Sequence, residues 1–467
     1  MLSVAVRNNL TTFVDAMIAG DKEALTRVAH ETIARAEDAS ELIGKIGLIA
    51  MHGDSDGHAV LTLSAASMLC RRLIALRHVL GEEAPNQARG IPLVVQALLA
   101  AAPAVKIGKD TPDNYPEPLF PSGLPADETV GSAIQKAIYG RDTNMVERLL
   151  FGLYGTGADY RSISIRIYDG IAQTFQESGH ALLYAVRGSQ VLDAVEWGED
   201  APHYIHWLAP HLPIHSAEPD WIAAVRGFLS EPGHSLASYR TRLAAPHNEQ
   251  ALPLRALLLS DTPAPQICQA TYDALISNGA SARGVGSVIA LAACDLLQAC
   301  GDNHDLFVQA AHGLLYASAT RLIYTQVQEV EALPALFTAA TYVNALYKEL
   351  GSPAAGQTTR PGSAGGGLIA PTLLESLSNQ VAAQDITGAM ASARRYIQLG
   401  HDMHALFGVI GLEAARVNAS ADQGHTLQIV QAAGEEYLAW PEDLASTNME
   451  GFLQVALRAA ALAQRNL

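Results

Sequence analysis

The hexapeptide HALLYA at residues 180–185 returns as HGLLYA at residues 312–317, and this repeated phrase decides how we interpret the fold. In both copies a tyrosine follows the histidine four residues later. Positions i and i+4 lie on one face of an α-helix, so each phrase is expected to present an imidazole and a phenol side by side. The repeat therefore predicts a helical unit that occurs twice.

Helical periodicity continues outward from these phrases through almost the whole chain. The stretch LTLSAASMLCRRLIAL at residues 61–76 carries apolar residues on most faces, which predicts a buried helix. No run of the sequence alternates convincingly between apolar and polar residues, as a half-buried strand would. We therefore predict an all-α, large multi-helix fold of roughly 18–22 helices, with internal duplication into two pseudo-symmetric helical halves.

The composition supports extensive packing between helices. Of 467 residues, 49% are hydrophobic, which is ample for a sizeable core. Only 16% are charged, below the usual quarter, so each helix is expected to expose little surface. The four cysteines show no CxxC spacing, and we expect them to be buried free thiols in a reducing compartment. They are Cys70, Cys268, Cys294 and Cys300.

The charge and the hydropathy pattern restrict the partners. The formal net charge of −17 repels nucleic acids and anionic membrane surfaces at long range. The N-terminus lacks the features of a signal peptide, and no uninterrupted apolar run approaches the ~18 residues typical of a membrane span. We expect a soluble cytoplasmic protein without a nucleic-acid or membrane partner.

Four regions are expected along the chain. Residues 1–216 form an N-terminal helical half, and residues 217–350 form a central helical region that holds the second copy of the repeat. Residues 351–367, GSPAAGQTTRPGSAGGG, have the composition of a flexible linker. Residues 368–467 form a C-terminal helical region. The proline-rich segment 103–128 is expected to be a long loop and is a candidate lid.

A second, shorter phrase lies outside the first pair. DGHA at residues 56–59 is echoed by DMHA at residues 402–405, so the four phrases follow one another in mirrored order. A pseudo-twofold arrangement of the halves would bring their histidines to one place, with the aspartates as further ligands or as orienting groups. The candidate metal ligands are His58, His180, His312, His404, Asp56 and Asp402.

These residue types favour a metal site. Neutral imidazole is the commonest metal ligand near pH 7, and several histidines with a carboxylate on facing helices suit iron, copper, manganese or zinc. Tyr184 and Tyr316 are candidate catalytic proton donors. In the alternative interpretation each histidine merely donates to a backbone carbonyl in the core. Side chains of His180 and His312 more than ~10 Å apart would rule out a shared site, because ligand bonds are only ~2 Å long.

The remaining histidines carry weaker expectations. His203 and His206 are expected at the surface or at the rim of a cleft, and His425 is expected in the N-terminal turn of a late helix. The turn between His52 and His58 is expected to be solvated or to cap a helix. The sequence contains no HExxH motif, no Walker loop and no GxSxG elbow.

The chain resembles the questin oxidase-like proteins. The resemblance rests on HALLYA at 180–185, on HGLLYA at 312–317, and on the Asp-x-His turn that opens a later helix at Asp402 and His404. It implies a helical fold and an oxidative, Baeyer–Villiger-like ring cleavage of aromatic polyketides. Similar regions occur fused to Rieske ferredoxin domains, but this sequence has no Rieske Cys-x-His motif.

We therefore expect a metal-dependent oxidoreductase with non-haem iron or another transition metal. It would act with O₂ on a small hydrophobic or aromatic metabolite, use an external electron donor, and be compatible with a homodimer. Two alternatives remain open. One is a non-catalytic helical ligand-binding or scaffold protein, and the other is a haem-binding helical protein with His180 or His312 as an axial ligand.

Overall fold

The computed structural model describes residues 4–80, 86–195, 197–301, 303–350, 368–441 and 448–464. Over these residues the chain forms α-helices and short 3₁₀ turns and no strand, which confirms the all-α prediction. The helices are α1 (Val4–Ala19), α2 (Lys22–Thr32), α3 (Ala36–Met51), α4 (His58–Leu80), α5 (Ile91–Gly108), α6 (Val130–Tyr139), α7 (Thr143–Gly155), α8 (Tyr160–Ile171), α9 (His180–Arg187), α10 (Trp197–Leu208), α11 (Asp220–Ser230), α12 (Leu254–Leu258), α13 (Ala264–Ile276), α14 (Ala282–Ala299), α15 (His304–Gln326), α16 (Pro334–Leu350), α17 (Ala370–Ala382), α18 (Ile386–Gln398), α19 (Met403–Ala414), α20 (His425–Ala439) and α21 (Glu450–Ala463).

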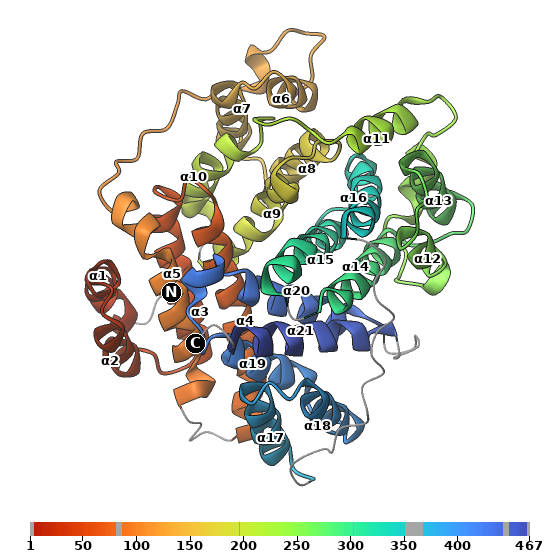
Figure 1. Cartoon of the computed structure of the whole chain (residues 1–467). Helices are drawn as coiled ribbons and strands as arrows, with labels where there is room; N and C mark the ends of the chain where they lie inside the picture. Colours follow the sequence, from red (N-terminus) through yellow and green to blue (C-terminus); the bar gives the residue numbers. More distant parts are fainter. Residues whose placement is uncertain are drawn as a thin grey trace.

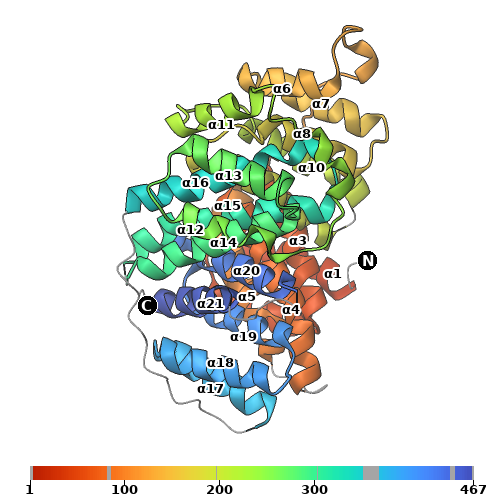
Figure 2. The same cartoon turned by 90° about the vertical axis from the view of Figure 1, so that its right-hand side faces the viewer.

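The helices are arranged around a centre to which all parts of the chain contribute. Figures 1 and 2 show α6 and α7 at one end of the molecule and the α17–α18 hairpin at the other. Between them, α3 packs against α4 and α5, while α14 packs against α15 and α16. The predicted linker, residues 351–367, lies outside the described residues.

Helix α4 is central because its sequence is apolar on most faces. It packs against α3, α5, α19 and α20, and residues as far apart in it as Val60 and Leu76 are buried. Burial of this kind removes apolar surface from water on every side of the helix, which stabilises it much more than its intrinsic propensity does. The four cysteines are free thiols, and all but Cys300 are buried.

Four helices form a closed ring at the middle of the molecule. Helix α4 packs against α9 and α20, and α15 also packs against α9 and α20. Figure 1 shows these four helices meeting near its centre. They come from all three predicted helical regions, because α4 and α9 precede residue 217, α15 belongs to the central region and α20 to the C-terminal one.

Buried ion pairs hold part of this ring together. Glu436 of α20 is completely buried and accepts hydrogen bonds from Arg321 Nε at 2.6 Å and from Ser318 Oγ at 2.8 Å. On the neighbouring side, Arg187 of α9 pairs with Glu435 and donates to Ser318 Oγ at 2.8 Å. A buried charge without its partner is costly, so this network commits α9, α15 and α20 to one mutual arrangement.

The internal duplication stays a prediction. The first phrase begins the eight-residue helix α9 at His180, whereas His312 of the second phrase lies in the middle of the 23-residue helix α15. The two copies therefore share the spacing of histidine and tyrosine but occupy different positions in their helices.

Three helices are long and apolar enough to cross a membrane by length and composition alone: α4, α5 and α14. Of the apolar window in each, 78%, 61% and 78%, respectively, is buried inside the protein. The expectation of a protein without a membrane partner rests on the sequence and stays a prediction.

Candidate metal centre

Four histidines meet at one end of the ring of helices. They are His58 at the start of α4, His180 at the start of α9, His312 within α15, and His425 at the start of α20. Their rings form a closed circuit, with centroid distances of 5.0 Å from His58 to His180, 5.1 Å from His180 to His312, 4.9 Å from His312 to His425, and 5.4 Å from His425 to His58. Each helix of the ring thus supplies one imidazole.

Backbone carbonyls fix the orientation of three of these rings. The Nδ1 atom of His425 lies 2.5 Å from the carbonyl oxygen of Asp422, and that of His312 lies 2.9 Å from the carbonyl of Val308. The Nδ1 atom of His180 contacts the carbonyl of Glu177 in the same way. A carbonyl oxygen only accepts, so each Nδ1 carries the proton and each Nε2 presents a lone pair.

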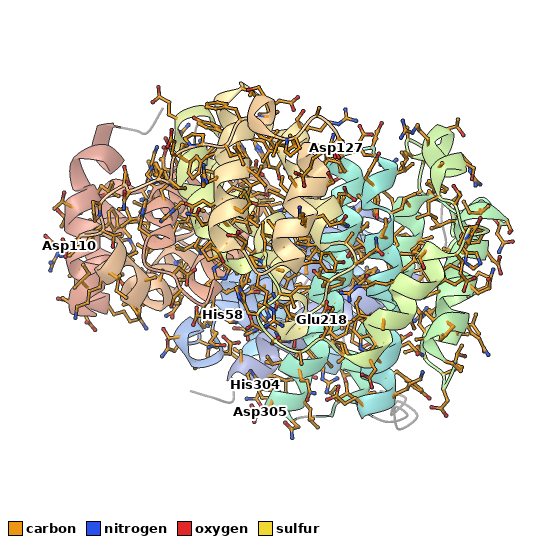
Figure 3. All side chains as sticks on the ribbon, turned by 90° about the horizontal axis from the view of Figure 1, so that it is seen from above. His58, Asp110, Asp127, Glu218, His304 and Asp305 are labelled. Atoms are coloured by element: carbon orange, nitrogen blue, oxygen red, sulfur yellow. The ribbon has the colours of Figure 1, made fainter. Side chains whose placement is uncertain are left out.

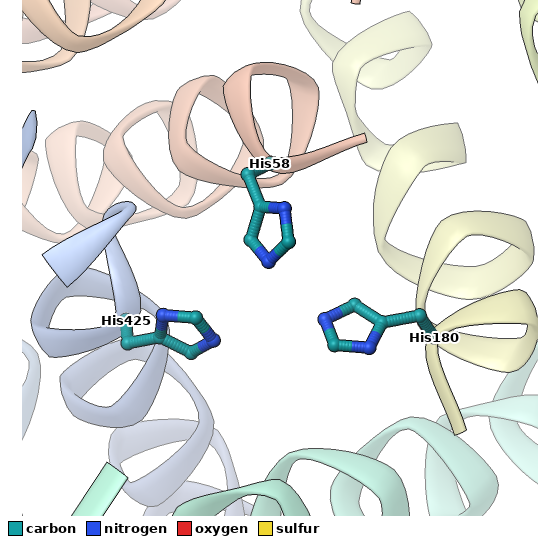
Figure 4. A group of neighbouring side chains, drawn as sticks. All are labelled: His58, His180 and His425. Atoms are coloured by element: carbon teal, nitrogen blue, oxygen red, sulfur yellow. The ribbon is translucent and has the colours of Figure 1, made fainter. Parts of the chain in front are cut away.

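The lone pairs point toward one another. The Nε2 atoms of His312 and His425 are 3.2 Å apart, and ligand nitrogens of His58, His180 and His425 all lie within 4.8 Å of one another. Figure 4 shows the last three rings directed at a common space. Two lone pairs cannot hydrogen-bond to each other, whereas a cation between them would bind both. Ligand bonds of about 2.0–2.1 Å place two tetrahedral ligands about 3.3 Å apart, close to the observed separation.

Burial keeps these imidazoles neutral. The exposed fractions are 8% for His180, 9% for His312 and 4% for His425. Burial, with a smaller contribution from neighbouring imidazoles, lowers the pKa of His180 to about 4 and that of His312 to about 3. Burial also lowers the pKa of His425. At neutral pH the ligand atoms are therefore unprotonated, which is the form that binds metal ions.

A recurring Gly-His turn places three of the four rings. Gly57, Gly179 and Gly424 each precede a site histidine and have φ of 75°, 86° and 75°, a left-handed backbone that glycine adopts without steric cost. Glu177 and Ser178, the two residues before Gly179, are also left-handed, at φ 47° and 56°. This turn brings the histidine ring back over the carbonyl three residues earlier, as seen in His180 and His425.

We predict that Gly424→Ala weakens metal binding by at least about 10-fold, because a Cβ at this position would overlap Thr62 Oγ1 and displace His425. Gly400→Ala is the matched control: Gly400 also has φ of 74° and precedes a histidine, but no atom lies within 4 Å of its added Cβ. Both variants should lose about 1–2 kcal/mol of folding free energy from left-handed strain. Equal metal affinities of the two variants would contradict the role assigned to the turn.

Three of the four predicted histidines are brought together, and His404 is not. Its helix, α19, runs antiparallel to α4, since Gly408 faces Leu73 and Gly411 faces Leu69. Leu73 is 15 residues after His58, about 22 Å along the helix, and His404 lies beyond it. His404 is exposed, and the Asp402 carboxylate caps its own helix by accepting from the His404 backbone nitrogen at 2.8 Å. The prediction of His404 and Asp402 as ligands is therefore corrected.

His425 takes the place that the sequence analysis gave to His404. It was expected only as a residue in an N-terminal turn, and it does begin α20. The signal that could have found it is the segment Asp422–His425, an acidic residue followed by x-Gly-His, which matches Glu177–His180. The Asp-x-His-Ala phrase that residues 56–59 and 402–405 share therefore does not mark a common site for His58 and His404.

Asp56 orients rather than binds. Its carboxylate accepts from the backbone nitrogen of His58 at 3.1 Å, and Oδ1 lies 3.5 Å from His58 Nδ1. The carboxylate thus lies behind the His58 ring on its Nδ1 side, the usual position of a group that orients a ligating histidine.

The two tyrosines do not line the cavity at the histidines. The hydroxyl of Tyr184 donates to the backbone carbonyl of Asp56 at 2.6 Å, and its ring packs on Gly57. The ring of Tyr316 packs on Gly179 in the same way, but its buried hydroxyl has no hydrogen-bond partner among the described residues. Burial raises the pKa of both phenols. Each tyrosine thus supports the turn before a site histidine, and the expected proton-donor role gains no support from their placement.

We predict that Tyr184→Phe lowers the free energy of unfolding by about 1 kcal/mol, because it removes a hydrogen bond to a backbone carbonyl. Tyr316→Phe should change it by less than about 0.5 kcal/mol or raise it, because the lost hydroxyl is unpaired. Chemical denaturation of the two variants beside the wild type measures both values. A larger loss of unfolding free energy for Tyr316→Phe would show that the Tyr316 hydroxyl has a hydrogen-bond partner in the folded protein.

An open cavity of about 750 Å³ gives access to the four rings. Most of the residues that line it are polar, among them Ser178, His304, Asp305, Gln309 and Gln423. Figure 3 shows His304 and Asp305 toward the outside of the molecule, at the start of α15. Polar residues surround these histidines because α15 and α20 begin here with polar turns.

The spacing of the rings argues against haem. A porphyrin with His180 or His312 as an axial ligand would need a wide flat space around that imidazole, and the neighbouring imidazoles already occupy it at centroid distances of 4.9–5.1 Å. Comparison of the chain with protein-family models, curated proteins and solved structures finds no match, so the resemblance to the questin oxidase-like family stays a prediction.

Proposed function

We propose that this protein is a metal-dependent oxidoreductase whose metal ion, non-haem iron or another transition metal, is held by His58, His180, His312 and His425. The observation that carries the proposal is the convergence of four imidazoles, three of them with Nδ1 bound to a backbone carbonyl. A non-catalytic scaffold would be expected to have scattered histidines.

The donor set narrows the metal. Imidazole nitrogen suits iron, copper, nickel and zinc, whereas calcium and magnesium prefer oxygen ligands. Four neutral ligands leave the ion its full positive charge, which favours the lower oxidation state and strengthens its action as a Lewis acid. When bound, a redox-active ion would supply the one-electron and O₂ chemistry that amino-acid side chains lack.

The residues of the cavity define the expected substrate. The polar wall suits a small aromatic or otherwise hydrophobic metabolite that carries hydroxyl or carbonyl groups at its edge, which Ser178, Gln309 and Gln423 could bind. Asp305 and His304 stand near the outer rim, where a substrate or an external electron donor would approach. We propose a cytoplasmic location on the sequence features alone.

Elemental analysis and absorption spectroscopy of the purified full chain test the proposal. We expect a stoichiometric transition metal and no Soret band. Dialysis against a chelator should remove the metal and lower the melting temperature, because a ligand bound only to the folded state stabilises that state. Protein that neither contains nor takes up iron, copper, manganese, cobalt or zinc would contradict the proposal. Uptake of zinc alone would contradict the oxidoreductase function and would favour Lewis-acid catalysis, because Zn²⁺ has no redox chemistry.

A further inference from the structure

A second cluster of histidines lies apart from the four rings described above. His52 follows the last residue of α3, His203 belongs to α10, and Asp113 lies on the segment between α5 and α6. His52 Nε2 is 2.7 Å from His203 Nδ1, and Asp113 Oδ1 is 3.4 Å from the first nitrogen and 3.9 Å from the second. Three elements distant in the sequence thus direct ligand-type atoms at one point.

Hydrogen bonding can satisfy only part of this arrangement. The hydroxyl of Tyr115 lies 3.1 Å from His203 Nδ1, the same atom that contacts His52. A ring nitrogen carries either one proton or one lone pair, so His203 Nδ1 cannot make full hydrogen bonds with both neighbours and also face the Asp113 carboxylate. A cation at this point would be bound by both nitrogens and the carboxylate at once.

We propose that His52, His203 and Asp113 form a second metal site, for Zn²⁺ or a similar first-row divalent ion, which fastens residues 109–120 to the junction of α3 and α10. Two imidazoles and one carboxylate are an established ligand set for such ions, with a remaining position for water. The rings must part by about half an ångström, since tetrahedral ligands at 2.0–2.1 Å from an ion are about 3.3 Å apart.

The surroundings suit an ion that enters from solvent. The Asp113 side chain is 60% exposed, whereas His52 is 6% exposed, so the carboxylate lies at the mouth of the site and the imidazole at its base. His206, one turn after His203, lies with its ring centroid 5.9 Å from that of His52 and donates to Glu147 at 2.5 Å. That contact anchors α10 beside the site.

Hydrogen bonds of the backbone also hold the segment of residues 109–120 in place. Leu119 donates to the carbonyl of Arg148 at 2.9 Å, and Arg148 Nε donates to the carbonyl of Glu117 at 3.0 Å. Asp113 and Tyr115 connect this part of the segment to α3 and α10. Residues 103–128 were expected to be a long loop and a candidate lid, but residues 103–108 belong to α5, and no described residue after Ile107 lines the cavities at His58.

This second site does not rest on the proposed function, because it shares no residue with the four-histidine centre. The test is a titration of the metal-free full chain with Co²⁺ and with Zn²⁺, in the wild type and in Asp113→Ala. Asp110→Ala is the matched control, since Asp110 is an exposed aspartate on the same segment (Figure 3). His203→Ala supports the comparison, and Asp113→Ala, altered at an exposed position, is expected to fold.

We expect Asp113→Ala to lose one bound ion, or to bind it at least about 10-fold more weakly, while Asp110→Ala matches the wild type. His425→Ala should keep this ion. Zn²⁺ should also slow hydrogen exchange of residues 109–120 in the wild type and in Asp110→Ala but not in Asp113→Ala. Identical Co²⁺ and Zn²⁺ binding by Asp113→Ala and the wild type would overturn the proposal, whether or not the four-histidine centre binds an ion.

Discussion

Replacement of His425 by alanine is expected to weaken the binding of a transition metal ion by more than about 100-fold. Changes in groups that only orient a ligand cost 10–100-fold in affinity, and loss of the ligand itself should cost more. The His425 side chain is buried, with 4% exposure, and its Nε2 lies 3.2 Å from that of His312, so the substitution removes one of the four proposed ligands.

His404→Ala is the matched control for this experiment. His404 belongs to the phrase that the sequence alone favoured, but its side chain is exposed at the start of α19. Competition titration with Co²⁺ or Zn²⁺ should therefore give wild-type affinity for His404→Ala. If His404→Ala loses the ion and His425→Ala retains it, the assignment of the centre is wrong. Circular dichroism shows whether each variant is folded.

Replacement of Glu436 by alanine is expected to lower the free energy of unfolding by about 3–5 kcal/mol, the usual cost of removing one partner of a buried ion pair. Glu436 is completely buried, and Arg321, at 5% side-chain exposure, would keep an unpaired charge in the core. The loss of its contacts with Ser318 and Ser287 would leave two more buried donors without this acceptor.

Glu450→Ala is the control for Glu436→Ala. Glu450 pairs with Arg394 at 2.9 Å, but both side chains are 43–49% exposed, so its removal should cost no more than about 1 kcal/mol. Denaturant unfolding followed by circular dichroism measures both changes. A cost for Glu436→Ala as small as that for Glu450→Ala would show that the network does not hold the ring of helices together.

The fold class could be predicted from the sequence because composition and the helical period of apolar residues can be read within short stretches of the chain. A stretch such as residues 61–76, apolar on most faces, is stable only when other helices cover it, so all-α packing follows from the pattern itself. The closed ring of α4, α9, α15 and α20 could not be predicted, because it depends on contacts between residues far apart in the chain. The buried pair of Arg321 and Glu436 likewise has no local signature.

Three of the four histidines of the site were predicted, because local sequence patterns mark them. His180 and His312 stood out because a distinctive phrase repeats around them, and His58 because the Asp-x-His-Ala phrase at 56–59 recurs at 402–405. His425 did not, since its likeness to His180 lies in the acidic-x-Gly-His residues before the helix, which form a turn with a left-handed glycine, rather than in the residues that follow. His404 shares the Asp-x-His-Ala phrase with His58 but belongs to α19 and lies beside the opposite end of α4.

The most direct test of the central claim is the position of a bound ion. Crystals of the full chain loaded with Co²⁺ or Zn²⁺ should show an anomalous difference peak about 2.0–2.2 Å from Nε2 of His425 and of at least two among His58, His180 and His312. An occupied centre of this kind, absent from His425→Ala, is the result that we predict. Loaded crystals with no anomalous peak among these four imidazoles would contradict the account, even if an ion is bound elsewhere on the protein.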